Sequence, residues 1–139
     1  MDNLARLQDP VVLVARLLLA TIFVIEGWLK IKDYSGTAAY MEANGVSGLL
    51  LPLVILTELG GSLLVAFGLF TRLAAVALVG FCLLTAFFFH MAPDQAVHFY
   101  KNLSMAGGLL LLAAYGPGGW SLDARLWRQR GGTPAGMVR

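Results

Sequence analysis

Long apolar runs alternate with shorter polar ones along the chain. Four runs approach or reach the about 17–25 residues that a membrane-crossing helix needs, namely 11–31, 49–70, 73–91 and 99–115. The fourth has the shortest apolar core and needs its polar first residues, 99–102, to reach the membrane surface. The pattern predicts an all-α fold, an integral membrane four-helix bundle. It forms one four-span domain over 1–130, followed by a disordered tail over 131–139.

The polar connections predict two further short helices. The segment 33–48 favours a short interfacial helix from Ser35 to Asn44, with Gly45 as the left-handed residue that ends it. Beyond the fourth span, Ser121 or Asp123 is placed to cap a second short helix, in which tryptophans and arginines suit the membrane interface. The bundle therefore carries one interfacial helix in its first outer loop and one in its C-terminal tail.

Basic residues are distributed unequally between the two sides of the predicted bundle. Four spans place both termini on one side of the membrane. On or toward that side lie Arg6, Arg16, Arg72, Arg125, Arg128, Arg130 and Arg139, and toward the other lie Lys30, Lys32 and Lys101. Positive charge is retained on the cytoplasmic side, so this bias predicts cytoplasmic termini. The loops 32–48 and 92–98 then face outward.

Composition excludes several classes of protein. Of the 139 residues, 58% are hydrophobic and 13% are charged, with a mean hydropathy of +0.75, which is far from a soluble domain. The net charge of +2 is explained by the topological bias, so we predict no nucleic-acid partner. The single Cys82 forbids an internal disulfide or a dithiol relay. We predict no metal site, and no flavin or haem motif is evident.

Glu58 is the carboxylate that most needs explanation, because it lies inside an apolar span. It is nine residues from the start of its span at Leu49, which places it about 13 Å deep. A side chain that can ionise at this depth faces a protein interior, a cavity or a partner charge. Arg16, six residues into the first span from the other side, is the predicted partner. We expect an Arg16–Glu58 charge pair.

Further polar residues cluster in the outer third of the bundle, above Glu58. They extend the prediction to an outward-facing polar cavity whose ligand-binding residues are Glu26, Lys30, Glu58, His90, Lys101 and Asn102. A structural interpretation stays open beside it. The pair of Glu26 and Lys30, four residues apart, would then only fix helix register, and His90 and His98 would be structural or interfacial. The glycine pairs are predicted helix-packing sites, and they are Gly60, Gly61, Gly107 and Gly108.

Three strings together resemble the DoxX family of small four-helix membrane proteins. They are RLLLATIFVIEGWLKI, ELGGSLLVAFGLFTRLAA and KNLSMAGGLLLLAAYGPGGWSLD, in this order along the chain. The positions that the resemblance covers include Arg16, Gly27, Lys30, Glu58, Gly68, Thr71, Arg72, Lys101, Asn102, Ser121 and Asp123. The family is named after a subunit of a thiosulfate:quinone oxidoreductase, and other members are linked to oxidative and thiol stress beside partner redox proteins. The resemblance thus implies a multi-pass protein of the bacterial inner membrane, a quinone or other small redox molecule as its ligand, and a soluble redox partner.

Three functions follow from these observations. The first is a quinone-linked membrane subunit, catalytic or not, in which Lys30, Lys101 or Asn102 donates to the quinone carbonyls while Glu58 or Glu26 relays protons. The second is an assembly or quality-control factor without ligand chemistry. The third is a small proton-coupled transporter that uses Glu58. A homo-oligomer is compatible with each of them.

Overall fold

The structure, a computed structural model, describes residues 2–131. Its elements are α1 (Asp2–Lys32), α2 (Tyr34–Ala43), η1 (Gly48–Leu50), α3 (Leu51–Ile55), η2 (Leu56–Gly60), α4 (Gly61–Phe67), α5 (Thr71–Phe89), η3 (Pro93–Gln95), α6 (Ala96–Tyr115) and α7 (Leu122–Gln129). Within 2–131 there is no strand, so the all-α prediction is confirmed. Of the predicted tail, 132–139 lies outside the described residues, and Gly131 forms a turn after α7.

Three helical segments are long and apolar enough to cross a membrane. They are Leu4–Lys32, the continuous stretch Gly48–Phe67 that joins η1, α3, η2 and α4, and Thr71–Phe89. They correspond to the first three predicted spans, although α1 begins well before residue 11 and continues through Pro10. The 20 residues of α6 match a span in length, but their polar first turns keep α6 out of this group. The fourth span therefore stays a prediction.

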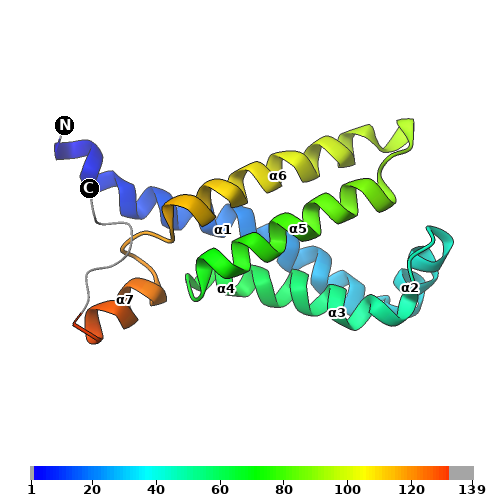
Figure 1. Ribbon diagram of the computed structural model, residues 1–139, viewed down its shortest axis with the longest axis horizontal. Helices are drawn as coiled ribbons and strands as arrows, with labels where there is room; N and C mark the ends of the chain where they lie inside the picture. The colour runs from blue at the N-terminus through cyan, green and yellow to red at the C-terminus, as the bar shows by residue number, and fades with distance from the viewer. Residues whose placement is uncertain (1, 132–139) are drawn as a thin grey trace.

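The long helices run roughly along one axis, and α7 and α2 lie at opposite ends of it (Figure 1). We call these the α7 end and the α2 end. The α7 end also holds the beginning of α1. Helices α5 and α6 form an antiparallel hairpin with the most extensive helix contact, while α1 packs along α4 and η2. The molecule thus consists of two helix pairs that meet along part of their length.

The apolar core lies where the two helix pairs meet. Its fully buried members come from three helices and include Val65 of α4, Leu78 of α5 and Leu109 of α6, each with 0% of its surface exposed. Phe23 of α1 completes this contact and is 2% exposed. The core therefore joins the long helices near their middle and leaves the α2 end less tightly packed.

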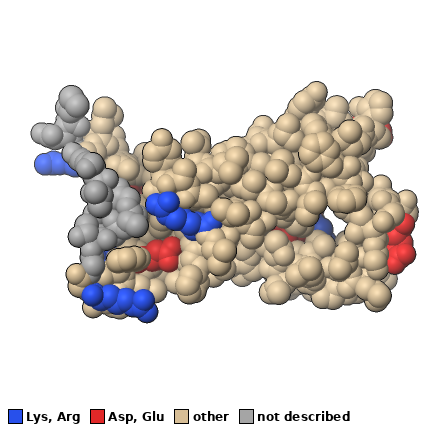
Figure 2. All heavy atoms as spheres, viewed as in Figure 1, with Lys and Arg blue, Asp and Glu red and all other residues tan. Residues whose placement is uncertain are grey.

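The outer faces of the long helices carry many large apolar side chains. Leu18 of α1 is 70% exposed, Leu73 of α5 is 73% exposed and Leu111 of α6 is 62% exposed. Figure 2 shows a broad band with few charged atoms on one face, between charged groups toward the two ends. Exposed apolar surface of this extent is expected where lipid, rather than water, surrounds a protein.

Both predicted short helices are present, with Gly45 and Ser121 in their predicted places and Asp33 as a further cap that the sequence analysis did not name. Helix α2 begins after Asp33, whose side chain accepts from the Gly36 N–H at 3.2 Å, and Gly45 follows its C-cap with φ of +78°. Helix α7 begins after Ser121, whose Oγ accepts from the Ala124 N–H at 3.1 Å. A hydroxyl or carboxylate in this position satisfies a free N–H of the first turn, so both short helices start where the chain offers one.

Candidate functional site

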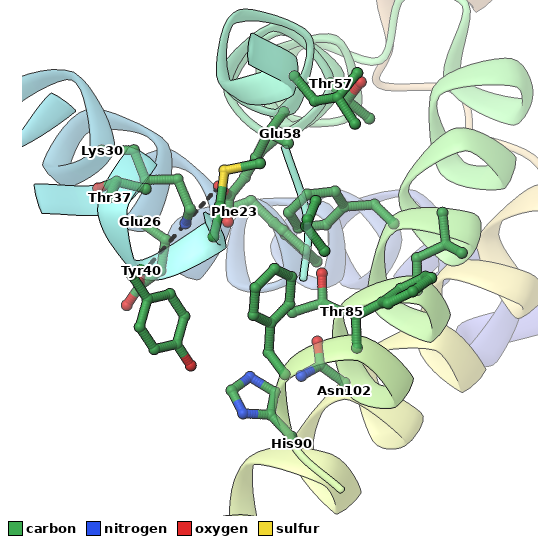
Figure 3. A pocket seen from close by; sticks show the side chains of 18 of the residues that line it. Phe23, Glu26, Lys30, Thr37, Tyr40, Thr57, Glu58, Thr85, His90 and Asn102 are labelled. Atoms are coloured by element: carbon green, nitrogen blue, oxygen red, sulfur yellow. Dashed lines mark ion pairs between the residues drawn. The ribbon is translucent and has the colours of Figure 1, made fainter. Parts of the chain in front are cut away.

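A cavity of about 1200 Å³ opens at the α2 end between the two helix pairs. Helices α1, α2 and α3 with η2 form one wall, and α5 and α6 form the other (Figure 3). All six residues predicted as ligand-binding line it, and these are Glu26, Lys30, Glu58, His90, Lys101 and Asn102. Figure 2 shows this hollow between α5 and α3, with basic and acidic atoms visible inside. The structure therefore brings the predicted polar residues to one site.

Glu58 ends a chain of charges that leads from the buried part of the cavity toward its surface. Its Oε2 lies 2.7 Å from Lys30 Nζ, and the same Nζ lies 3.8 Å from Glu26 Oε2. The exposed fraction of the side chain rises along this chain, from 4% for Glu58 to 22% for Lys30 and 49% for Glu26. One ammonium group thus connects a buried carboxylate to a half-exposed one (Figure 3).

The backbone around Glu58 departs from a regular α-helix. Residues Leu56–Gly60 form a π-helical turn within the otherwise α-helical span. Such turns insert one residue into the helix and recur at functional sites. Thr57 and Glu58, neighbours in this turn, both line the cavity.

A close helix contact sets the distance between Lys30 and Glu58. A Cβ at Gly27 would lie 3.0 Å from Leu59 Cβ, so α1 and the π-helical turn approach as closely as a glycine allows. Lys30 lies about one turn beyond Gly27, and Glu58 directly precedes Leu59. The missing side chain at Gly27 therefore brings ammonium and carboxylate within reach of each other.

The structure does not bring Arg16 and Glu58 together as predicted. Arg16 is 1% exposed and donates from Nη2 to the backbone carbonyl of Trp120, toward the α7 end, while Glu58 pairs with Lys30. The correction has a simple cause. Counting residues gives depth along a helix, but not that the segment after α6 folds back over α1 and surrounds the guanidinium.

Two histidines and a lysine lie at the open end of the cavity. The rings of His90 and His98 are stacked, with centroids 5.2 Å apart. His90 Nδ1 lies 3.2 Å from Gln95 Oε1, and Lys101 Nζ lies 3.5 Å from His98 Nδ1. Burial lowers the pKa of His90, the hydrogen bond with Gln95 opposes this, and the nearby His98 and Lys101 lower it further. Among the described residues, no three His, Cys, Asp or Glu side chains form a group able to hold a metal.

Asn102 faces the charge chain from the opposite wall. Its Nδ2 donates to the carbonyl of His98 in the preceding turn at 2.9 Å, so its side-chain oxygen remains an acceptor. Thr57 and Thr85 also line the cavity, and Figure 3 shows Thr85 beside Asn102. The sequence analysis missed both threonines. The available signal was a hydroxyl within an apolar span, one of them next to Glu58.

The four glycines predicted to pack helices do not behave alike. A Cβ at Gly61 would lie 3.2 Å from Leu78 Cγ, and one at Gly108 would lie 3.1 Å from a methyl group of Leu19. A Cβ at Gly60 would contact only Leu56 of its own span, and one at Gly107 would meet no described atom within 4 Å. One member of each pair therefore lies at a helix contact.

Comparison with known proteins agrees with this membrane architecture. A family model described as DoxX matches residues 11–91. Inner membrane protein YqjF of Escherichia coli (strain K12) is 52% identical over 124 residues, which cover 87% of this chain and 95% of the relative. Inner membrane protein YphA of the same organism is 36% identical over 128 residues, 85% of this chain and 91% of the relative. No solved structure matches the chain. With a family model that matches more than half of its length and inner-membrane relatives along most of it, the chain belongs to the DoxX family and is an inner-membrane protein.

Proposed function

We propose that the cavity binds the ring of a quinone and that the protein is a quinone-linked subunit of a redox system. The observation that carries the proposal is the Glu58–Lys30 ion pair at the buried end of a large cavity with mostly apolar walls. A quinone needs an apolar slot, donors for its carbonyl oxygens and an acceptor for the protons of its reduced form. Lys30 and Lys101 are donors of this kind, and Glu58 is the acceptor.

The charge chain gives the protons a route. A proton taken up by Glu58 is passed through rearrangement of the Lys30 contact to Glu26, whose side chain is half exposed. Because the 2.7 Å and 3.8 Å contacts share one Nζ, a small movement of the lysine changes which carboxylate it neutralises. This arrangement suits a group that must bind a proton and then release it.

The topology proposed with this function has α6 as a fourth span, both termini in the cytoplasm and the cavity opening outward. The support is the lysine and arginine bias, with arginines at the α7 end and Lys30, Lys32 and Lys101 at the α2 end. Electrons would pass to or from a soluble partner redox protein, because Cys82 is the chain's single cysteine and is fully buried. An assembly factor without ligand chemistry remains the alternative, in which the Glu58–Lys30 pair only joins helices.

The test is a thermal-shift titration of the purified protein with duroquinone, a tail-free quinone whose ring has no free position for reaction with thiols. A ligand that binds only the folded state raises Tm with its occupancy, so the parent protein should show a concentration-dependent rise. Lys101→Met removes one donor, worth about 0.5–1.5 kcal/mol, and should weaken binding about two- to tenfold while leaving the unliganded Tm unchanged. Arg125→Gln, on exposed α7, is the control and should bind like the parent.

The opposite result is equally clear. If saturating duroquinone leaves the parent Tm unchanged, and solvent extraction of the purified protein yields no quinone, the quinone proposal is lost and the assembly-factor alternative takes its place. A fall in the unliganded Tm of Lys101→Met, without any change in duroquinone affinity, would assign Lys101 to structure instead of binding.

A further inference from the structure

The two helix pairs are tightly joined in one half of the molecule and separated in the other. A Cβ at Gly61 of α4 would lie 3.2 Å from Leu78 Cγ of α5, and Leu78 is fully buried there. Helix α3, which continues the same span toward the α2 end, scarcely touches α5. The span that contains α3 and α4 therefore diverges from α5 beyond the π-helical turn, and the cavity occupies the opening.

The opening between α3 and α5 reaches the lateral surface of the molecule. Leu53 of α3 is 59% exposed, and Leu84 and Phe88 of α5 are 60% and 57% exposed, yet all three line the cavity. A residue can do both only at the rim of an opening. All three belong to segments long and apolar enough to span the membrane, so this rim lies beside lipid.

Gly80 lies on the α5 side of this opening, about one turn from the end at which α5 meets α4. It lines the cavity, and a Cβ there would meet no described atom within 4 Å. The neighbouring lining residues on α5 are apolar, such as Ala77 and Phe81, whereas Glu58 and Lys30 add a charged pair whose side chains are 4% and 22% exposed. The opening is thus an apolar passage that connects the lipid-facing side of the molecule with the Glu58–Lys30 pair.

We propose that the gap between α3 and α5 is a lateral portal, through which the ligand enters from the bilayer and in which the apolar tail of a bound quinone lies. This inference rests on the proposed function and specifies its substrate class, a quinone with an isoprenoid tail. The polar ring reaches Lys30 and Glu58, while the tail passes Gly80 and leaves between Leu53 and Leu84. A tail in the portal exchanges one apolar environment for another, so tail length adds little intrinsic affinity.

The portal is tested by filling it. Gly80→Phe places a ring in the passage, and Gly107→Phe is the matched control, since Gly107 also has open space around its Cβ and does not line the cavity. Both variants and the parent are reconstituted in nanodiscs, and the dissociation constants of ubiquinone-1 and ubiquinone-4 are measured. The ratio of variant to parent is taken for each quinone, which removes the difference in their partition into lipid.

We expect Gly80→Phe to weaken ubiquinone-4 binding about tenfold or more, because the ring and the tail compete for one space. Ubiquinone-1, whose tail is one isoprene unit, should change less than about twofold, and Gly107→Phe should change neither. Equal losses for both quinones, no loss for either, or native mass spectrometry showing a phospholipid in the portal that ubiquinone-4 does not displace would overturn the portal. Parent protein that binds ubiquinone-1 but fails these comparisons keeps its quinone site and loses only the portal, whereas parent protein that binds neither quinone loses both.

Discussion

At the scale of single residues, the buried carboxylate of Glu58 depends on one long side chain. Lys30 lies in the last turn of α1, at the α2 end, yet its Nζ reaches to within 2.7 Å of the buried Glu58 Oε2. A lysine near a helix end usually extends toward water. Here the attraction of a carboxylate that is 4% exposed holds it in the opposite direction. Removing either partner leaves the other charge in an apolar environment, which costs more than the pair itself contributes.

A double-mutant cycle measures this dependence. Lys30→Gln and Glu58→Gln should each lower the free energy of unfolding, and the double variant should lose less than the sum, with a coupling of about 1–3 kcal/mol because Lys30 is partly exposed. Arg16→Gln combined with Glu58→Gln is the control and should be additive within about 0.5 kcal/mol. Thermal or denaturant unfolding in one detergent provides the four free energies. Coupling found for Arg16 and absent for Lys30 would contradict the observed pairing.

Sequence reasoning located Glu58 and its neighbours but not its partner. The apolar run showed that a carboxylate at this depth needs a counter-charge, and the outer-third position of Lys30 was recognised. The partner, however, depends on the rotation of each helix about its axis, and the π-helical turn at Leu56–Gly60 changes that rotation. No residue pattern predicts such a turn. The prediction of Arg16 as the partner of Glu58 therefore rested on the depth of the two residues alone.

At the scale of elements, a residue of α7 caps the N-terminus of another helix, α5. Helix α5 begins after Phe70, which has φ of +47° and no capping side chain of its own. The carboxylate of Asp123 in α7 accepts from the N–H groups of Phe70 and Thr71 at 2.8 and 2.9 Å, and from Thr71 Oγ1 at 2.8 Å. The Asp123 N–H in turn donates to the Gly68 carbonyl at 2.8 Å. The tail helix is therefore bonded to the tight turn between α4 and α5.

Replacing this carboxylate should loosen the turn. Asp123→Ala removes three hydrogen bonds to the start of α5 and should cost about 1–3 kcal/mol, seen as a fall of several degrees in Tm. Asp94→Ala, an exposed aspartate of η3, is the matched control and should leave Tm unchanged. The quinone affinity of Asp123→Ala should stay that of the parent, since Asp123 is not among the cavity-lining residues. An unchanged Tm would show that α7 contributes no stability to the turn.

The same elements show which local features the sequence could predict. The glycine end of α2 and the polar cap of α7 were predicted, because Gly45 and Ser121 act on their immediate neighbours. The capping of α5 by Asp123 joins residues about 50 positions apart, and periodicity carries no information at that range. For the same reason, the glycine pairs were recognised, but not which member of each pair meets another helix.

At the scale of the whole molecule, the buried core and the cavity occupy different parts of the fold. The buried contacts of Val65, Leu78 and Leu109 hold the helices together near the middle. At the α7 end, the hydrogen bonds of Asp123 join α7 to the start of α5. The α2 end is left open because α3 and α5 diverge, which leaves polar groups around a cavity instead of in a packed core. A well-packed region next to an open cavity suits the proposed site, which exchanges a ligand with the bilayer.

This division makes the orientation in the membrane decisive, since it determines which compartment the charge chain serves. The basic bias predicts that the α2 end faces outward, and α6 must cross the membrane for both ends of the chain to remain inside. In a Cys82→Ala background, cysteines at Ser47 and Ala96, exposed at the α2 end, should react with an impermeant thiol reagent added to intact cells, and one at Gln129 of α7 should react only after lysis. Labelling of Gln129 and protection of Ser47 would invert the molecule and direct the proton route from Glu58 through Glu26 toward the cytoplasm. Labelling of all three positions in intact cells would leave α6 on the membrane surface, because the first three crossings already place Ser47 and Ala96 on the same side and α7 returns to the inside only if α6 also crosses.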